Sequence, residues 1–148
     1  MKYSKLCEVY EALSSTPSRL EKTDILANFL KNISDKDKDV IYLLLGKVYP
    51  DYDKRNIGIS SQTIIKSVAK VSGVDEKKVV DEWKKIGDLG EVAEKFISEK
   101  KQYSLFGKEL VVERVLNDLR KFPDMEGKGT VGRKIDLIAG LLSDAKGV

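Results

Sequence analysis

Histidine is absent from the 148-residue chain, and cysteine occurs once. Without histidine, the chain cannot supply a Ser-His-Asp triad, a histidine general acid or base, or a histidine metal ligand. The single Cys7 cannot form a disulfide within the chain or complete a multi-cysteine zinc site. Its helical spacing with apolar neighbours favours a packing role. We therefore expect no metal site in this chain.

Long apolar runs and an excess of one charge are also lacking. No apolar run approaches the roughly 18 residues of a membrane-spanning helix, and no signal peptide opens the chain. These absences predict a soluble cytoplasmic protein with no membrane partner. The 27 Lys and Arg residues nearly balance the 24 Asp and Glu residues, so the net charge is only +3. A nucleic-acid site would therefore have to be a local basic patch.

Apolar residues recur at helical spacing along most of the chain, whereas alternating runs long enough for a sheet are missing. Capping residues and glycines separate the apolar segments. The sequence predicts an all-α fold, an irregular array of about eight helices without a fixed repeat. We expect Leu20 and Leu30 on the buried side of the second helix, and Val40–Leu45 as a central helix. The eight helices are predicted near residues 3–13, 20–32, 40–45, 64–71, 76–86, 89–97, 112–119 and 130–142.

A Gly-Asp-Leu-Gly string at Gly87–Gly90 admits two interpretations, a ligand loop or a tight corner between helices. We favour the corner, with Gly87 as a C-cap and Asp88 as an N-cap. Gly90 would then allow close packing of the helices. Trp83 is interpreted in the same way, as a core residue rather than a base-stacking platform.

The stretch Gly127–Leu142 joins a glycine loop to an apolar helix, with Thr130 where an N-cap is wanted. The first turn of a helix presents unpaired N–H groups and the positive end of the helix dipole. Lys128, Arg133 and Lys134 add full positive charges beside it. This combination suits a phosphate group. The alternative is a capped core helix whose basic residues are simply solvated, and composition does not decide between the two.

Three separated segments carry a family resemblance. They are L-G-K-V-Y-P-D-Y-D-K-R-N-I-G-I at Leu45–Ile59, I-G-D-L-G-E-V-A at Ile86–Ala93, and Gly127–Leu142. In order and spacing, they resemble the N-terminal DNA-binding domain of ATP-dependent DNA ligases, the archaeal and eukaryotic replicative kind. The resemblance covers Tyr3 to Ala145. It implies that residues 1–148 belong to one DNA-binding domain, truncated at its C-terminal end.

The resemblance implies an all-helical domain that holds nicked double-stranded DNA from the minor-groove side. Such a domain acts through backbone contacts and shape, because a ligase must accept any sequence. Gly127, Gly129 and Thr130 match the G-x-G-S/T loop of the family, and Lys134 matches the basic residue after it. Lys128 and Arg133 are added on charge and position alone.

Lys66, in I-I-K-S-V, also matches a lysine of the family. A solvated position on its helix is an equally good interpretation of this residue. It completes the predicted set of DNA contacts, which is Lys66, Gly127, Lys128, Gly129, Thr130, Arg133 and Lys134.

The family resemblance also implies chemistry that this chain does not contain. Ligases of this kind attach AMP from ATP to a lysine in a K-x-D-G motif, transfer it to the 5′ phosphate of the nick, and seal the strand with Mg²⁺ present. The nearest string, Lys134-Ile135-Asp136-Leu137, has leucine in place of glycine and falls inside a predicted helix. We therefore expect no catalytic residue and no cofactor in this fragment, and ATP and Mg²⁺ only in the parent enzyme.

A second predicted partner is a sliding clamp. Gln102-Tyr103-Ser104-Leu105-Phe106 resembles a shortened clamp-binding box, in which a glutamine and nearby apolar residues fill a pocket of the clamp. Leu105 replaces the first aromatic residue, and the spacing is compressed. The alternative is that Leu105 and Phe106 pin a loop to the core.

A different class of function also fits the composition, namely a helical protein-interaction module without a nucleic-acid role. The modest net charge and the abundant Glu/Lys pairs would permit it. The placement of charge distinguishes the two classes. Convergence of Lys66, Lys128, Arg133 and Lys134 would favour DNA binding, whereas interleaved acidic residues would favour the interaction module.

Overall fold

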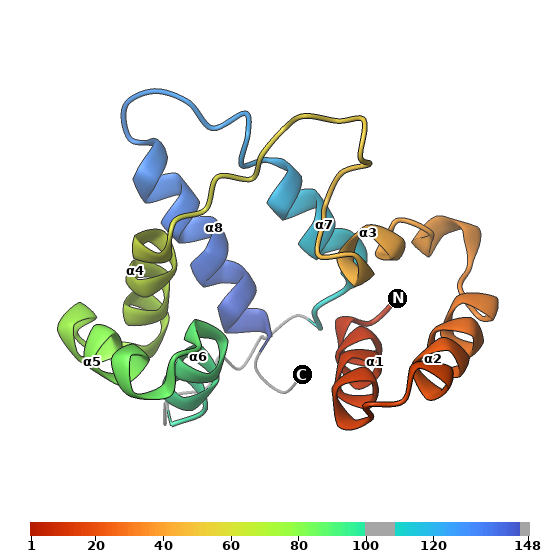
Figure 1. The fold of residues 1–148 in the computed structure, drawn as a ribbon. Helices are drawn as coiled ribbons and strands as arrows, with labels where there is room; N and C mark the ends of the chain where they lie inside the picture. The colour runs from red at the N-terminus through yellow and green to blue at the C-terminus, as the bar shows by residue number, and fades with distance from the viewer. Residues whose placement is uncertain (100–108, 146–148) are drawn as a thin grey trace. The chain divides into compact units, whose positions relative to one another are not determined.

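The computed structural model describes residues 1–99 and 109–145, and within these ranges the chain is all-α (Figure 1). The predicted fold class is confirmed. An isolated antiparallel bridge joins Lys2 and Val111, and the described residues contain no strand. The helices are α1 (Tyr3–Ser15), α2 (Arg19–Lys31), the 3-10 helix η1 (Asp35–Asp37), α3 (Val40–Leu44), α4 (Ser61–Ser72), α5 (Glu76–Ile86), α6 (Leu89–Ser98), α7 (Val112–Arg120) and α8 (Thr130–Asp144).

The chain divides into two compact units. The first unit comprises Met1–Lys54 and Leu110–Asn117, and therefore contains α1, α2, η1, α3 and the beginning of α7. The second unit comprises Arg55–Glu109 and Asp118–Gly147, and contains α4, α5, α6 and α8.

The first unit is held together by its N-terminal residues. The N–H of Tyr3 donates to the carbonyl of Leu110 at 2.9 Å, and the N–H of Val112 donates to the carbonyl of Met1 at 3.0 Å. The ammonium of Met1 also donates to a carboxylate oxygen of Asp37 at 2.7 Å. These bonds join the start of the chain to η1 and to the beginning of α7. The buried residues of this unit are Leu6, Val40, Val48, Tyr49, Leu110, Val112, Val115 and Leu116.

The expected burial of α2 and α3 is wrong. None of the residues of α2 is buried, and Leu20 and Leu30 are exposed. In α3, Val40 is buried but Ile41 is exposed, and Leu45, which follows the helix, is exposed as well. An apolar composition predicts that a helix is buried. It does not identify which other part of the chain would bury it.

The start of α2 forms half of the capping box that its sequence predicts. The hydroxyl of Ser18 accepts a bond from the N–H of Glu21 at 3.3 Å, as a capping box requires. The carboxylate of Glu21 does not return to Ser18 directly. It accepts from the hydroxyl of Thr16, whose oxygen accepts from the N–H of Ser18 at 3.2 Å.

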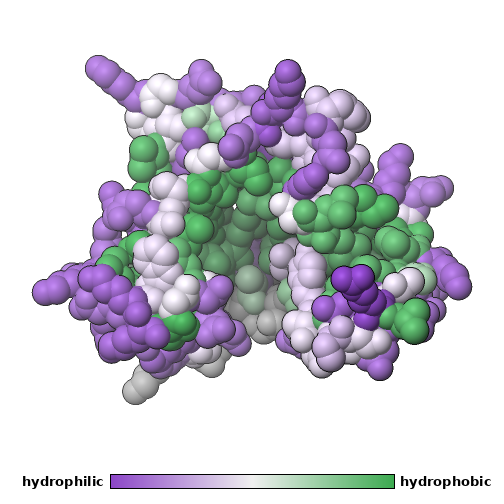
Figure 2. Space-filling model, in the orientation of Figure 1, coloured by the Kyte–Doolittle hydropathy of each residue, from purple (hydrophilic) through white to green (hydrophobic). Residues whose placement is uncertain are grey.

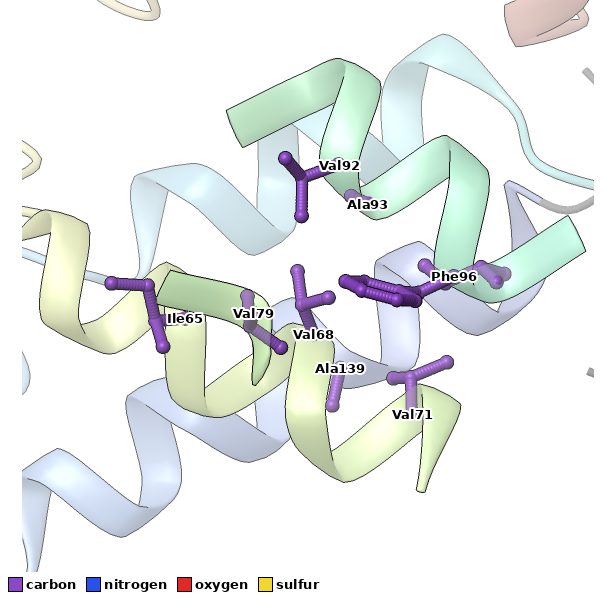
Figure 3. Packing of buried hydrophobic residues seen from close by; sticks show 9 residues of the cluster. Ile65, Val68, Val71, Val79, Val92, Ala93, Phe96 and Ala139 are labelled. Carbon is purple, nitrogen blue, oxygen red and sulfur yellow. The ribbon is translucent and has the colours of Figure 1, made fainter. Parts of the chain in front are cut away.

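The second unit has a core formed by four helices. Figure 3 shows the side chains of α4, α5, α6 and α8 directed toward one another, with the ring of Phe96 beside the valines of α4. Trp83 is half-buried and packs against this cluster, which agrees with its predicted core role. The cluster consists of Ile65, Val68, Val71, Val79, Val92, Ala93, Phe96, Ile97 and Ala139.

The corners of the second unit follow the predicted caps. Gly73 and Gly87 end α4 and α5 with left-handed backbone, φ 75° and 88°, a conformation that glycine adopts without a steric penalty. Asp88 begins α6. The role predicted for Gly90 needs revision, because a Cβ at Gly90 would lie 2.9 Å from a carboxylate oxygen of Asp88. Glycine at this position makes room for the cap.

Candidate nucleic-acid interface

The glycine loop before α8 places Gly129, not Thr130, at the N-cap. Gly127 and Gly129 have φ 95° and 79°, and Gly129 supplies no capping side chain. Thr130 is the first helical residue and is buried, with 8% of its surface exposed. The preference of threonine for N-caps led to the wrong position here, because a left-handed glycine can take the cap and leave the next residue helical.

The side chain of Thr130 turns back into the loop. Its hydroxyl donates to the carbonyl of Gly127, and its backbone N–H approaches the same carbonyl at 3.4 Å. Both bonds close the turn formed by Gly127, Lys128 and Gly129. The hydroxyl therefore fixes the shape of the loop before α8.

The first turn of α8 differs from those of the other helices of this unit. The hydroxyl of Ser60 accepts from the N–H of Thr63 at 3.2 Å at the start of α4. Asp75 accepts from the N–H of Lys77 at 2.7 Å, and Asp88 accepts from the N–H groups of Gly90 and Glu91 at 2.6 and 3.0 Å. Side chains thus occupy the starts of α4, α5 and α6. The start of α8 has no such side chain and can receive an outside acceptor.

Basic residues lie in the loop before α8, in its first two turns, and on the neighbouring helix α4. Lys128 and Arg133 are exposed, whereas Lys134 and Lys66 are half-buried. Among the residues that the structure describes, none of these four makes an ion pair. Their positive charges are therefore not neutralised by the carboxylates of the described chain.

The contact between α4 and α8 brings Lys66 and Lys134 to the same level of the helix pair. The two helices lie side by side (Figure 1), and the hydroxyl of Ser67 on α4 donates to the carbonyl of Ile135 on α8 at 3.3 Å. Lys66 and Lys134 immediately precede these two residues in the sequence. The second unit therefore contains the whole predicted set of DNA contacts.

Acidic residues lie beside the basic set in two places: exposed Glu126 directly precedes Gly127, and Asp136 follows Lys134 on α8. Asp136 on α8 forms an ion pair with Lys70 on α4, so its charge is compensated within the helix pair. The same segment shows that Lys134-Ile135-Asp136-Leu137 is continuous α-helix. The structure does not present Lys134 on a loop, as a reacting lysine in a K-x-D-G motif would need.

Two residues near the candidate site were not predictable from the sequence. Ser67 is fully buried and links α4 to α8, but a single serine on a helix carries no signal for a partner 68 residues away. Val131, in the first turn of α8, leaves 59% of its surface exposed. An apolar side chain in the first turn of a helix would be expected to pack inward, so the sequence carried no sign of this exposure.

The other predicted sites yield less. Gln102, Leu105 and Phe106 lie outside the described residues, so the clamp-binding prediction stays a prediction from the sequence. Residues 1–99 and 109–145 contain no group of three His, Cys, Asp or Glu side chains suited to a metal ion. No helix in those ranges is long and apolar enough to span a bilayer.

Residues 1–99 and 109–145 are thus all-helical, and in the second unit the start of α8 lacks a capping side chain and has basic residues near it, as a phosphate site requires. A family model described as DNA ligase N terminus matches residues 2–148, and the chain belongs to this family. The family predicted from the three sequence segments is thereby confirmed.

Curated relatives in archaea carry the name DNA ligase. The DNA ligase of Methanosphaera stadtmanae is 40% identical over 97% of this chain and 26% of its own length. Those of Thermococcus fumicolans and Nanoarchaeum equitans are 38% and 36% identical, each over 99% of this chain and 26% of the relative. The chain thus spans about a quarter of the length of the relatives that it matches.

Proposed function

We propose that this chain holds nicked double-stranded DNA for an ATP-dependent DNA ligase. In this proposal, residues 1–148 are part of a DNA-binding domain at the N terminus of a longer enzyme. The downstream part of that enzyme would contain the catalytic core and use ATP and Mg²⁺. The observation that carries the proposal is the open start of α8, which lacks a capping side chain and has Lys128, Arg133 and Lys134 beside it in the sequence, none of them in an ion pair within the described chain.

A DNA phosphate fits this helix start for two reasons. The unpaired N–H groups can donate hydrogen bonds to phosphate oxygens, and the helix dipole favours negative charge there. Lys128, in the loop, and Arg133, in the first turn of α8, are exposed and add full positive charges near this helix start. Each neutralised phosphate would release counterions and strengthen binding at low salt.

Contacts of this kind do not distinguish one base sequence from another. Phosphate contacts fix the position of a protein on the duplex, whereas base edges in the grooves carry sequence information. A set built from backbone N–H groups, lysines and one arginine therefore supports binding without sequence preference. This property agrees with the needs of an enzyme that seals nicks wherever they occur.

Thr130 takes a positioning role in this proposal. Its hydroxyl is used by the carbonyl of Gly127, and the residue is buried. A side chain so occupied is poorly placed to reach DNA itself. It supports binding by holding the loop that presents Lys128 and the N–H groups of α8.

The experiment that tests the proposal is a salt titration of binding to a nicked duplex. The chain is compared with a triple variant, Lys128→Ala, Arg133→Ala and Lys134→Ala. We expect salt-dependent binding, with the variant weaker and its log–log salt slope shallower by up to about 3.

A second triple variant on α5, Lys77→Ala, Lys84→Ala and Lys85→Ala, is the matched control. It removes the same number of positive charges from exposed positions of α5, of which Lys85 forms an ion pair with Glu82 at 3.3 Å. Equal loss of affinity in both variants would reduce the effect to net charge and contradict a site at α8. Absence of binding at low salt would contradict the proposal for this chain.

The second candidate function, a helical protein-interaction module, is favoured by the exposed apolar residues of the first unit, among them Leu20 and Leu45. The same titration distinguishes it, since a module without a nucleic-acid role would show no salt-dependent DNA binding. Docking on a sliding clamp through Gln102, Leu105 and Phe106 stays a prediction from the sequence.

A further inference from the structure

Gly132 is an exposed glycine in the first turn of α8, and no contact within the described residues requires a glycine there. Its backbone is helical, a conformation that alanine and most other residues adopt. A Cβ at this position would meet nothing within 4 Å, so no neighbouring group needs the space. Glycine is less favourable than alanine inside a helix, because it loses more conformational freedom on folding. Packing within the described chain therefore does not explain the residue.

Gly90, a glycine in the first turn of α6, has an explanation within the chain. A Cβ at Gly90 would lie 2.9 Å from a carboxylate oxygen of Asp88, and the same oxygen accepts from the N–H of Gly90 at 2.6 Å. There the missing side chain makes room for an acceptor that belongs to the chain itself. At α8 the chain supplies no capping side chain, so the same role for Gly132 needs an acceptor from outside.

Two adjacent N–H groups at the start of α8 are available to such an acceptor. The N–H groups of Thr130 and Arg133 each approach a carbonyl of the preceding loop at 3.4 Å. Between them in the sequence, the N–H groups of Val131 and Gly132 have no hydrogen-bond acceptor within the described residues. Both residues are exposed.

A side chain at position 132 would lie over these two donors. Gly129 is the N-cap, so Gly132 is the third helical residue, from which a glutamate or glutamine side chain folds back to the N-cap in a capping box. The Cα–Cβ bonds of a helix are tilted toward its N-terminus, so even a methyl group there would lean toward the helix start. Glycine leaves the two N–H groups accessible.

We propose that the missing side chain of Gly132 admits a DNA phosphate to the N–H groups of Val131 and Gly132. This inference rests on the proposed binding of nicked DNA at the start of α8. A phosphate suits the position because the helix dipole favours an anion and because Lys128 and Arg133 add positive charge in the loop and the first turn. In Figure 2, hydrophilic side chains project at the upper left, where Figure 1 places the loop before α8 and the start of that helix.

Binding to a nicked duplex by Gly132→Ala and Gly132→Gln tests this inference. We expect Gly132→Gln to bind about tenfold more weakly, because its side chain competes with the phosphate for charge-assisted hydrogen bonds. Gly132→Ala should weaken binding by a smaller factor. The urea midpoint of both variants should equal or exceed that of the unsubstituted chain, since both residues favour a helix more than glycine does. Weaker binding would therefore not result from unfolding.

Two substitutions farther along α8 are the matched controls. Gly140 is also helical, and a Cβ there would meet nothing within 4 Å, so Gly140→Ala makes the same change away from the helix start. Ser143→Gln places the longer side chain at an exposed position in the last turn. Neither control should change the affinity for DNA. Unchanged affinity in Gly132→Gln, or an equal loss in Ser143→Gln, would overturn the inference.

Amide signals in proton–nitrogen correlation spectra report on the contact directly. The signals of Val131 and Gly132 should shift when the nicked duplex is added to the unsubstituted chain, and the Val131 signal should shift less in Gly132→Gln. If neither amide of the unsubstituted chain responds to bound DNA, the phosphate does not lie at these two donors.

The inference and the DNA-binding proposal fail in different ways. If the triple variant of Lys128, Arg133 and Lys134 loses affinity while Gly132→Gln binds normally, the DNA-binding proposal stands and the role of Gly132 is overturned. Absence of binding by the unsubstituted chain would overturn both.

Discussion

The hydroxyl of Ser67 on α4 lies 3.3 Å from the carbonyl oxygen of Ile135 on α8, and it also donates to the carbonyl of Thr63 at 2.8 Å. Ser67 has no exposed surface. A small residue at this point lets the two helices approach closely, and its hydroxyl is satisfied by carbonyls already present in the helices. The contact sets the spacing of the helix pair that carries the candidate DNA site.

Enlarging this side chain should therefore force α4 and α8 apart. We expect Ser67→Leu to lower the free energy of unfolding by about 1–3 kcal/mol, the usual effect of overpacking. Ser67→Ala should lower the free energy of unfolding by no more than about 1 kcal/mol. It removes the hydroxyl entirely and so leaves no unsatisfied donor in the core. Urea denaturation followed by circular dichroism measures both. Ser98→Leu, at an exposed position of α6, is the control, and a similar loss there would contradict the packing argument.

The two glycines at the start of α8 should respond oppositely to alanine. Gly129 has φ 79°, so Gly129→Ala should destabilise the chain by about 1–2 kcal/mol. Gly132 is helical, and a Cβ there would meet nothing within 4 Å. Gly132→Ala should stabilise by about 0.5–1 kcal/mol, because alanine loses less backbone entropy in a helix. Thermal or urea unfolding that gives the same sign for both would contradict the left-handed cap.

The hydroxyl of Thr130 should act through the loop. Thr130→Val keeps the volume but removes the bond to Gly127, so we expect a loss of about 1 kcal/mol in stability. Affinity for nicked DNA should fall as well, with the salt slope unchanged, because no charge is lost. Thr130→Ser retains the hydroxyl and should restore both values. Weaker DNA binding without any loss of stability would indicate direct contact with DNA instead of positioning.

The pair of Met1 and Asp37 predicts a pH dependence. A hydrogen bond from the N-terminal ammonium, assisted by one from the hydroxyl of Ser34, lowers the pKa of the Asp37 carboxyl from its ordinary value. A carboxyl with a lowered pKa in the folded state contributes stability above the unfolded pKa, near 3.9, and loses it as the pH falls through the folded value. Asp37→Asn should therefore destabilise the chain at neutral pH, and the difference should shrink toward acid.

Urea titrations at several pH values measure this effect. Asp35→Asn, an exposed change in the same 3-10 helix, is the matched control. Acetylation of the amino terminus removes the ammonium and should reproduce the Asp37→Asn effect. A stability difference that is constant with pH would contradict the ion pair.

Local chemistry explains why much of the fold was predictable. Gly73 and Gly87 end helices and Asp75 and Asp88 begin them because cap preferences depend on a few adjacent residues. The predicted burial of α2 and α3 was wrong because burial depends on contacts with residues distant in the sequence. Whether Ile41 is buried depends on which other helix packs against α3. The apolar composition of α3 does not answer that question.

In the candidate site, too, local features were predictable from the sequence and long-range features were not. A basic glycine loop before α8 was recognisable from the sequence, since its residues are consecutive. The cap at Gly129 was missed because the left-handed backbone shifts the helix start by one position. The alignment of Lys66 with Lys134 depends on the Ser67–Ile135 contact between distant segments, which no local pattern encodes.

The starts of α5 and α6, which are capped by their own aspartates, suggest how a single side chain could decide whether a helix start binds an anion. Asp75 and Asp88 are tethered anions that exclude a free one, and the bare Gly129 leaves the corresponding position on α8 open. An aspartate at Gly129, which tolerates left-handed backbone better than most residues, would act as an internal competitor for phosphate. In the proposed function, the phosphate site at α8 therefore depends on the absence of a capping carboxylate at this position.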